Sequence, residues 1–120
     1  MDGAILVIID DDPSFVRAVS RYLGHRGYRT ISAHSGSDGL ALLSNQRAAL
    51  AIIDVHLPDL SGIEMMEKLQ ANGNDLPCIF ISSDDRPHIQ DRCRAAGAVR
   101  FLPKPLSPGE LVSAIAEILE

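Results

Sequence analysis

Five short apolar runs recur along the chain, and longer segments with helical spacing of their apolar residues separate them. Runs of four or five residues are too short for helices. Three of the runs are continuously apolar, as strands are when helices cover both faces of a sheet. The pattern therefore predicts five strands, which cover Ile5–Ile9, Tyr28–Ser32, Leu50–Ile53, Cys78–Ile81 and Val99–Leu102.

The intervening segments carry signals that are typical of helix starts. In four of them a capping side chain precedes a proline or lies three residues before an acid. These starts are Asp12 with Pro13, Ser35 with Asp38, Ser61 with Glu64, and Ser107 with Pro108 and Glu110. The segment from Pro87 to Ala96 has the weakest helical pattern. In the first helix we expect one buried face, formed by Phe15, Val19, Tyr22 and Leu23.

Strands that alternate with helices predict an α/β fold, in which a doubly wound parallel sheet has helices on both faces. The chain has 120 residues, of which 46% are hydrophobic and 22% charged, and this fits one domain over residues 1–120. In such sheets, ligands bind beyond the carboxyl ends of the strands. We therefore expect the chemistry of the protein at that rim.

The charge of the chain excludes some classes of partner. A net charge of −5, with no concentration of basic residues, argues against a nucleic-acid-binding surface. The arginines of the first helix region have the spacing of a solvated face. No apolar stretch is long enough to cross a membrane, and the first apolar run is too short for a signal peptide. With only Cys78 and Cys93, at no metal-ligand spacing, we expect a cytoplasmic domain with reduced thiols.

Acids, hydroxyls and one lysine follow the predicted strands. These residues are Asp10, Asp11, Asp12, Asp54, Ser82, Ser83, Asp84, Asp85 and Lys104. Carboxylates that crowd one rim need a cation to stay ionised. Oxygen ligands with an open side suit Mg²⁺, and a lysine opposite them suits a phosphoryl group. A carboxylate in such a site can itself accept the phosphoryl group.

Several of these polar residues also have a simpler interpretation. We expect Asp12 to cap the helix that begins at Pro13, and Asp85 to cap the fourth helix. Asp59 and Ser61 are interpreted as turn and cap residues rather than as ligands. Three histidines lie at helix ends or in loops and are expected to be solvated: His25, His34 and His88.

Four stretches of the sequence resemble the receiver domain of bacterial two-component response regulators, over essentially the whole chain. They are VIIDDDPSF, IIDVHLPDLSGIEMM, IFISS and AGAVRFLPKPL, and each meets the end of a predicted strand. One such motif alone is weak, but four in the right order are specific. The resemblance implies the flavodoxin-like (βα)5 receiver fold, with a five-stranded parallel sheet in the order 2-1-3-4-5.

The resemblance also implies which residues form a phosphorylation site. By this similarity Asp54 is the phosphoacceptor. Mg²⁺ is held by the side chains of Asp10, Asp11 and Asp54 and by the backbone carbonyl of His56. Lys104 contacts the phosphoryl group.

Further positions match the family's switch elements. Ser82 corresponds to the hydroxyl that responds to phosphorylation, and Phe101 to the aromatic residue of the last strand that follows it. The Lys104–Pro105 peptide bond is expected to be cis. His56 and Asp84 stand where the family tunes dephosphorylation, and Asp84 could either orient or repel the incoming water.

By the same resemblance the chain is a signalling phosphoacceptor, which catalyses only its own phosphorylation and dephosphorylation. A sensor histidine kinase, a phosphotransfer protein or a small phosphodonor supplies the phosphoryl group to Asp54. Phosphorylation then alters partner binding through the fourth helix, fifth strand and fifth helix. The partners expected are an output domain or separate protein, and a second copy of the chain. Direct binding to nucleic acid or membrane is not expected.

Two other classes of protein compete with this interpretation. A Mg²⁺-dependent phosphohydrolase similar to the haloacid dehalogenase group also uses an aspartate nucleophile. Such enzymes carry a second aspartate two residues later, where this chain has His56, and usually a cap insertion. A receiver-like scaffold that is never phosphorylated is the other alternative, and the presence of Asp54 and Lys104 disfavours it.

Overall fold

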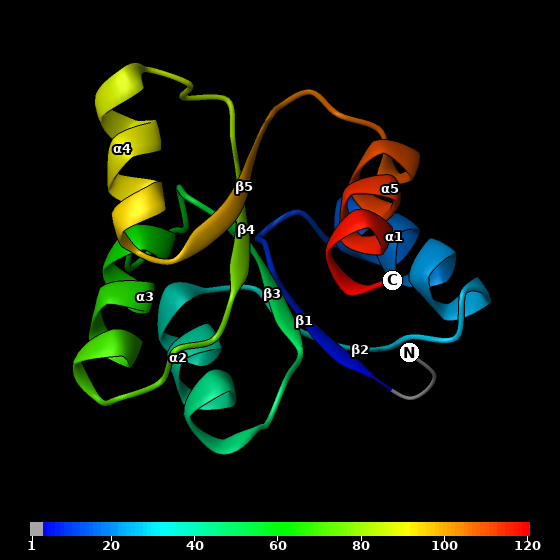
Figure 1. Cartoon of the computed structure of the whole chain (residues 1–120), viewed down its shortest axis with the longest axis horizontal. Helices are drawn as coiled ribbons and strands as arrows, with labels where there is room; N and C mark the ends of the chain where they lie inside the picture. The colour runs from blue at the N-terminus through cyan, green and yellow to red at the C-terminus, as the bar shows by residue number, and fades with distance from the viewer. Residues whose placement is uncertain (1–3) are drawn as a thin grey trace.

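The computed structural model describes residues 4–120, which form a parallel sheet with helices on both sides (Figure 1). The strands are β1 (Ile5–Ile9), β2 (Arg29–Ala33), β3 (Leu50–Asp54), β4 (Cys78–Ser82) and β5 (Ala98–Pro103). The helices are α1 (Pro13–His25), α2 (Gly36–Asn45), α3 (Gly62–Ala71), α4 (Pro87–Ala95) and α5 (Pro108–Leu119). All ten elements predicted from the sequence are present, and the ends of the five strands differ from the predicted ones by at most one residue. Within the described residues, no helix has the length and apolar character to cross a membrane.

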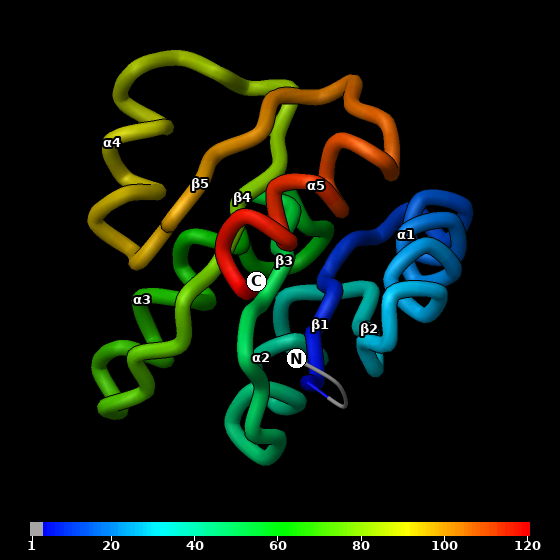
Figure 2. Tube along the Cα trace, turned by 45° about the vertical axis from the view of Figure 1, so that its right-hand side comes forward, coloured from blue at the N-terminus to red at the C-terminus, as the bar shows by residue number. Residues whose placement is uncertain are grey.

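The strands are parallel and lie in the order β2-β1-β3-β4-β5, which confirms the predicted receiver topology. The order reverses beside β1, because the chain first adds β2 on one side and then β3, β4 and β5 on the other. The register pairs Asp54 with Ile81 and Ser82 with Pro103, so the last residues of adjacent strands lie side by side. Figure 2 shows the chain leaving β4 and β5 at the same edge, toward α4 and α5 respectively.

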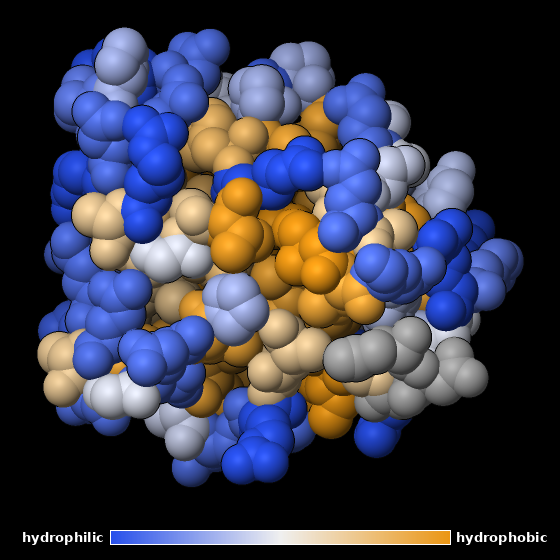
Figure 3. Space-filling model, viewed as in Figure 1, coloured by the Kyte–Doolittle hydropathy of each residue, from blue (hydrophilic) through white to orange (hydrophobic). Residues whose placement is uncertain are grey.

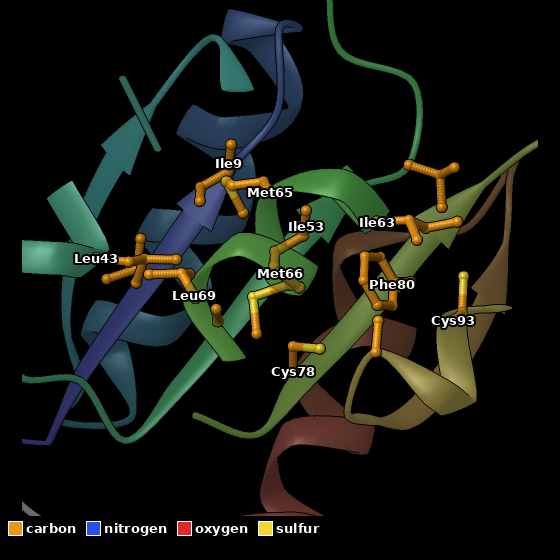
Figure 4. Close-up of a cluster of buried hydrophobic side chains, with 14 of the residues drawn as sticks. Ile9, Leu43, Ile53, Ile63, Met65, Met66, Leu69, Cys78, Phe80 and Cys93 are labelled. Atoms are coloured by element: carbon orange, nitrogen blue, oxygen red, sulfur yellow. The ribbon is translucent and has the colours of Figure 1, made fainter. Parts of the chain in front are cut away.

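Two apolar cores cover the two faces of the sheet, and the alternation of side chains along each strand assigns residues to them. In β1, Val7 and Ile9 join one core, whereas Leu6 and Ile8 join the other. The first core lies under α2, α3 and α4, and the second under α1 and α5. Figure 4 shows the first core, where Met66 of α3 lies over the strands. The three central strands are therefore buried on both faces.

Most helix starts follow the predicted capping chemistry. The side chain of Asp12 accepts hydrogen bonds from the backbone N–H groups of Ser14 and Phe15. Ser35, Ser61 and Ser107 cap α2, α3 and α5 by accepting from the backbone N–H three residues later. These side chains satisfy N–H groups that have no partner inside the helix.

Two local predictions are wrong. Tyr22 is 52% exposed, because Val16, Val19 and Leu23 form the buried stripe of α1 and Tyr22 lies beside it. Asp85 does not cap α4, whose N-cap residue is Arg86 and has no side-chain cap hydrogen bond. The backbone of Asp85 instead accepts a hydrogen bond from the Gln90 side chain.

Candidate functional site

Four adjacent strands bring the predicted site residues to one edge of the sheet. Asp10 directly follows β1, Asp54 and Ser82 are the last residues of β3 and β4, and Lys104 directly follows β5. These strands are neighbours in the sheet, so residues up to 94 positions apart in the chain meet at the rim. Parallel strands impose this arrangement, because all their carboxyl ends lie at the same edge.

Three carboxylates converge at this rim. Asp10, Asp11 and Asp54 each place a carboxylate oxygen within 4.8 Å of the others. Asp10 is 1% exposed and Asp54 6% exposed, whereas Asp11 lies at the surface. Buried carboxylates this close repel each other, so the arrangement requires positive charge nearby.

Lys104 provides part of that charge. Its Nζ lies 3.0 Å from Oδ2 of Asp54 and 3.4 Å from Oδ2 of Asp10, and it also lies 5.7 Å from the centre of the Phe15 ring. Burial by itself lowers the pKa of Lys104, but the hydrogen bond to Asp54 and the charges of both carboxylates raise it above its ordinary value. The ammonium group therefore stays charged between the two acids.

One lysine does not balance three acids. Burial raises the pKa of Asp10 above its ordinary value, and the charge of Asp54 raises it further, against the hydrogen bond from the Asp12 backbone and the attraction of Lys104. Carboxylate oxygens with one exposed side are the ligands and the geometry that suit Mg²⁺. The donor set of Asp10, Asp11 and Asp54 therefore fits a divalent magnesium ion.

Asp54 is held by its own loop. Its Oδ1 accepts a hydrogen bond from the backbone N–H of His56 at 3.1 Å, while Oδ2 faces Lys104. Gly62, at the start of α3, packs directly against this strand end, and a Cβ there would overlap the carbonyl oxygen of Asp54 and the side chain of Ile53. The chain therefore allows only glycine at this close approach.

Ser82 and Asp84 lie at the end of β4, next to the strand that ends in Asp54. The buried Ser82 hydroxyl accepts a hydrogen bond from the backbone N–H of Asp84 at 3.0 Å. The Asp84 carboxylate accepts two hydrogen bonds from Arg86, at 2.8 and 2.7 Å, and its Oδ2 lies 3.5 Å from Nε2 of His56. The hydrogen bonds from Arg86 hold the pKa of Asp84 well below its usual range.

The remaining predicted residues lie around this rim. The Lys104–Pro105 peptide bond is cis. Lys104 and Pro105 line a pocket of about 370 Å³ together with Asp12, Phe15, Ser83 and Leu106. Phe101 is half-buried on the side of the sheet that α4 covers, where it packs against the first core. Its place on β5 separates it from Asp54 by one intervening strand, β4.

Two residues near the site escaped the sequence-based interpretation. Arg86 binds Asp84, and Asp59, expected to be only a turn residue, accepts hydrogen bonds from the start of α2. The contact between Arg86 and Asp84 has a weak sequence signal, because the two residues have opposite charge and are two positions apart. The contact between Asp59 and Gly36 has none, because Gly36 lies 23 positions earlier in the chain. His34 is exposed as expected, but its Nδ1 also lies 3.1 Å from the backbone carbonyl oxygen of Asp10.

Known proteins share this fold and sequence pattern. The response regulator MprA of Mycobacterium ulcerans (strain Agy99) is 30% identical over 114 residues, which are 95% of this chain and 49% of that protein. The chain thus spans about half the length of the curated relatives that it matches. A CheY-like response regulator receiver domain protein from Methanospirillum hungatei JF-1 is 28% identical, with a TM-score of 0.90 over 98% of this chain and 94% of that one.

A second solved structure has the same fold at lower sequence identity. The receiver domain of the sensor histidine kinase PA1611 from Pseudomonas aeruginosa PAO1, with a magnesium ion in its active site cleft, is 24% identical, with a TM-score of 0.82 over 96% of each chain. Residues 6–116 of this chain match the family described as the response regulator receiver domain. The chain therefore belongs to the response regulator receiver domain family.

Proposed function

We propose that the chain is a phosphorylation-controlled switch that accepts a phosphoryl group on Asp54. The observation that carries this proposal is the setting of the Asp54 carboxylate, which lies between the ammonium group of Lys104 and the carboxylates of Asp10 and Asp11. A carboxylate held at the open rim of a sheet, with a cation on one oxygen, is placed to act as a nucleophile.

In the proposed reaction an oxygen of Asp54 attacks the phosphorus of a phosphohistidine or an acyl phosphate. The new O–P bond forms as the bond from phosphorus to the leaving group breaks, and the leaving group keeps the electron pair. A departing histidine then takes a proton from solvent. Lys104 already contacts Asp54 Oδ2, and its point charge suits the oxygens of the incoming phosphoryl group.

Mg²⁺ completes the proposed site. Asp10, Asp11, Asp54 and the backbone carbonyl of His56 would hold the ion, and it would supply positive charge beside the phosphoryl oxygens. The clustered carboxylate oxygens and the raised pKa of Asp10 support this assignment. The magnesium ion in the cleft of the Pseudomonas receiver domain is a further reason to propose one here.

The switch in our proposal runs from Ser82 to the face formed by α4, β5 and α5. On phosphorylation the Ser82 hydroxyl turns toward the phosphoryl group and loses the hydrogen bond from the Asp84 backbone N–H. The Phe101 side chain then moves toward the interior of the domain. This is a population shift between two packings. Val99 of β5, in this face, is 47% exposed. Figure 3, viewed as Figure 1, shows apolar surface near the centre of the view, where β5 crosses between α4 and α5. Partner proteins or a second copy of the chain bind there in the active state.

The proposed partners follow from membership of the family. A sensor histidine kinase or a phosphotransfer protein supplies the phosphoryl group, and an output domain or a separate protein receives the signal. Residues 1–120 act as one receiver domain in the cytoplasm, without direct contact to nucleic acid or membrane. The domain is a signalling phosphoacceptor that catalyses only its own phosphorylation and dephosphorylation.

The test is incubation of the protein with Mg²⁺ and acetyl phosphate, followed by intact mass measurement. We expect the mass of one phosphoryl group on the wild type and none on Asp54→Asn, and beryllofluoride should bind only the wild type. An unmodified wild type contradicts the proposal. Sustained hydrolysis of unrelated phosphate monoesters assigns the site to a phosphohydrolase instead.

A further inference from the structure

Asp59 lies in the loop between β3 and α3 and accepts hydrogen bonds from the start of α2. Its Oδ1 accepts a hydrogen bond from the backbone N–H of Gly36 at 2.7 Å, and its Oδ2 accepts one from Ser37 at 3.0 Å. Both N–H groups lie in the first turn of α2, where they have no partner inside the helix and where the helix dipole favours an anion. Asp59 thus caps α2 from 23 positions away.

The two segments are in close contact at this point. A Cβ on Gly36 would overlap the carbonyl oxygen and Cβ of Leu60, which follows Asp59. The same loop is closed at its base, because the backbone N–H of Gly62 donates to the carbonyl of Val55 at 2.9 Å. The loop from Asp54 to Gly62 is therefore fixed by a backbone hydrogen bond of its own and by the hydrogen bonds between Asp59 and the start of α2.

This loop carries His56, whose backbone N–H binds Asp54 and whose carbonyl is the proposed fourth metal ligand. The segment before α2 also contacts Asp10, another of the proposed metal ligands. His34, two residues before Gly36, places Nδ1 3.1 Å from the backbone carbonyl of Asp10. The segment from His34 to Ser37 therefore contacts both loops that supply the proposed metal ligands.

We propose that Asp59 is a positioning residue for the Mg²⁺ site, which it acts on by fixing the loop that carries the His56 carbonyl to the N-terminus of α2. This inference rests on the proposed function, because it takes Asp10, Asp11, Asp54 and the His56 carbonyl as the ligands. Groups that orient metal ligands from outside the coordination sphere contribute strongly to affinity. By thermodynamic linkage, Mg²⁺ binding and the contact between Asp59 and α2 must stabilise each other.

The first test compares Asp59→Asn with Ser61→Ala by Mg²⁺ titration, followed through backbone amide chemical shifts. Asparagine keeps the shape of Asp59 but turns an amide NH₂ toward an N–H of α2. Ser61→Ala is the matched control, because it removes a helix cap from the same loop, the hydrogen bond to the Glu64 N–H, without touching α2. We expect both variants to unfold more easily, and only Asp59→Asn to bind Mg²⁺ about tenfold more weakly.

The second test needs no variant. Amide hydrogen exchange at Gly36 and Ser37 of the wild type should slow when Mg²⁺ is added, whereas exchange at Glu64, capped within its own loop, should not change. Unchanged exchange at Gly36 and Ser37 overturns the inference, as does a wild-type Mg²⁺ affinity in Asp59→Asn. A wild type that binds no Mg²⁺ contradicts the metal site of the proposed function itself, and this inference falls with it.

Discussion

Lys104 donates a hydrogen bond from Nζ to Oδ2 of Asp54 at 3.0 Å, although 50 positions separate the two residues in the chain. The same ammonium group lies 3.4 Å from Asp10, so it balances charge in the acidic cluster while it marks where a phosphoryl oxygen can be bound. The contact has opposite consequences for the two proposed ligands of the site. A phosphoryl group gains a partner from Lys104, whereas Mg²⁺ competes with it for the same carboxylates.

Replacing Lys104 should therefore separate the two binding events. In Lys104→Met we expect phosphorylation by acetyl phosphate to slow by about 100-fold, because a preorganised charge at the transferring group is lost. Mg²⁺ should bind more tightly than in the wild type, because no ammonium group competes for Asp10 and Asp54. Phosphorylation rates by mass measurement and Mg²⁺ titration check the two effects. Lys68→Met, which removes an exposed lysine of α3, should change neither.

Replacing Asp10 should stabilise the metal-free protein. Asp10 is almost fully buried beside Asp54, and burial raises its pKa, so its ionised form opposes folding. We expect Asp10→Asn to raise the free energy of unfolding without metal by on the order of 1 kcal/mol, measured by urea denaturation. The exposed Asp75→Asn makes the same charge change and should have little effect.

Added Mg²⁺ should stabilise the wild type more than Asp10→Asn, since ligand binding to the folded state adds to its stability. A less stable Asp10→Asn would contradict this account.

Arg86 should control the charge that an incoming phosphodonor meets. Its guanidinium group holds the Asp84 carboxylate at 2.7 Å, within reach of the exposed His56 side chain. In Arg86→Gln the uncompensated Asp84 should repel the anionic donor, and we expect phosphorylation by acetyl phosphate to slow about threefold at low salt. The effect should shrink as salt is added.

Arg92→Gln is the control for this prediction, because Arg92 lies in α4, which Arg86 precedes, and its ion pair is with Glu67 of α3, not with Asp84. The net charge changes equally in both variants. Equal phosphorylation rates in Arg86→Gln and Arg92→Gln would mean that the contact between Arg86 and Asp84 has no influence on the donor.

The stability of the protein at alkaline pH should depend on Tyr28. The hydroxyl of this buried residue donates a hydrogen bond to Glu120, and burial together with this bond raises the pKa of Tyr28 from 10.0 to about 12. The folded protein thus holds this proton more tightly than the unfolded chain. The resulting stabilisation is complete below pH 10 and is lost as the pH rises toward 12.

Urea denaturation between these pH values should therefore show a steeper loss of stability for the wild type than for Tyr28→Phe. Tyr22→Phe changes an exposed tyrosine of α1 and should keep the wild-type slope. Parallel curves for the wild type and Tyr28→Phe would show that the hydroxyl of Tyr28 does not ionise on unfolding in this range.

Much of the fold could be predicted from the sequence because its signals are local. Continuous apolar runs such as Leu50–Ile53 indicate strands that helices cover on both sides, and Asp12 with Pro13 indicates a helix start. The strand order came from the family resemblance, since alternation alone leaves several orders open. Tyr22 shows where periodicity fails, because the width of a buried helix face depends on which elements pack against it.

The residues of the candidate site were also predictable, because parallel strands must place Asp10, Asp54, Ser82 and Lys104 at one edge. The residues that hydrogen-bond to the loops around the site could not be predicted from the sequence. Only the tertiary structure decided that Asp59 caps α2 and that Arg86, rather than solvent, holds Asp84. Such contacts depend on how loops distant in sequence pack and on which rotamers this packing allows, and no spacing along the chain records either. The sequence alone therefore determined which groups meet at the rim, and the packing of the loops determined what holds them in place.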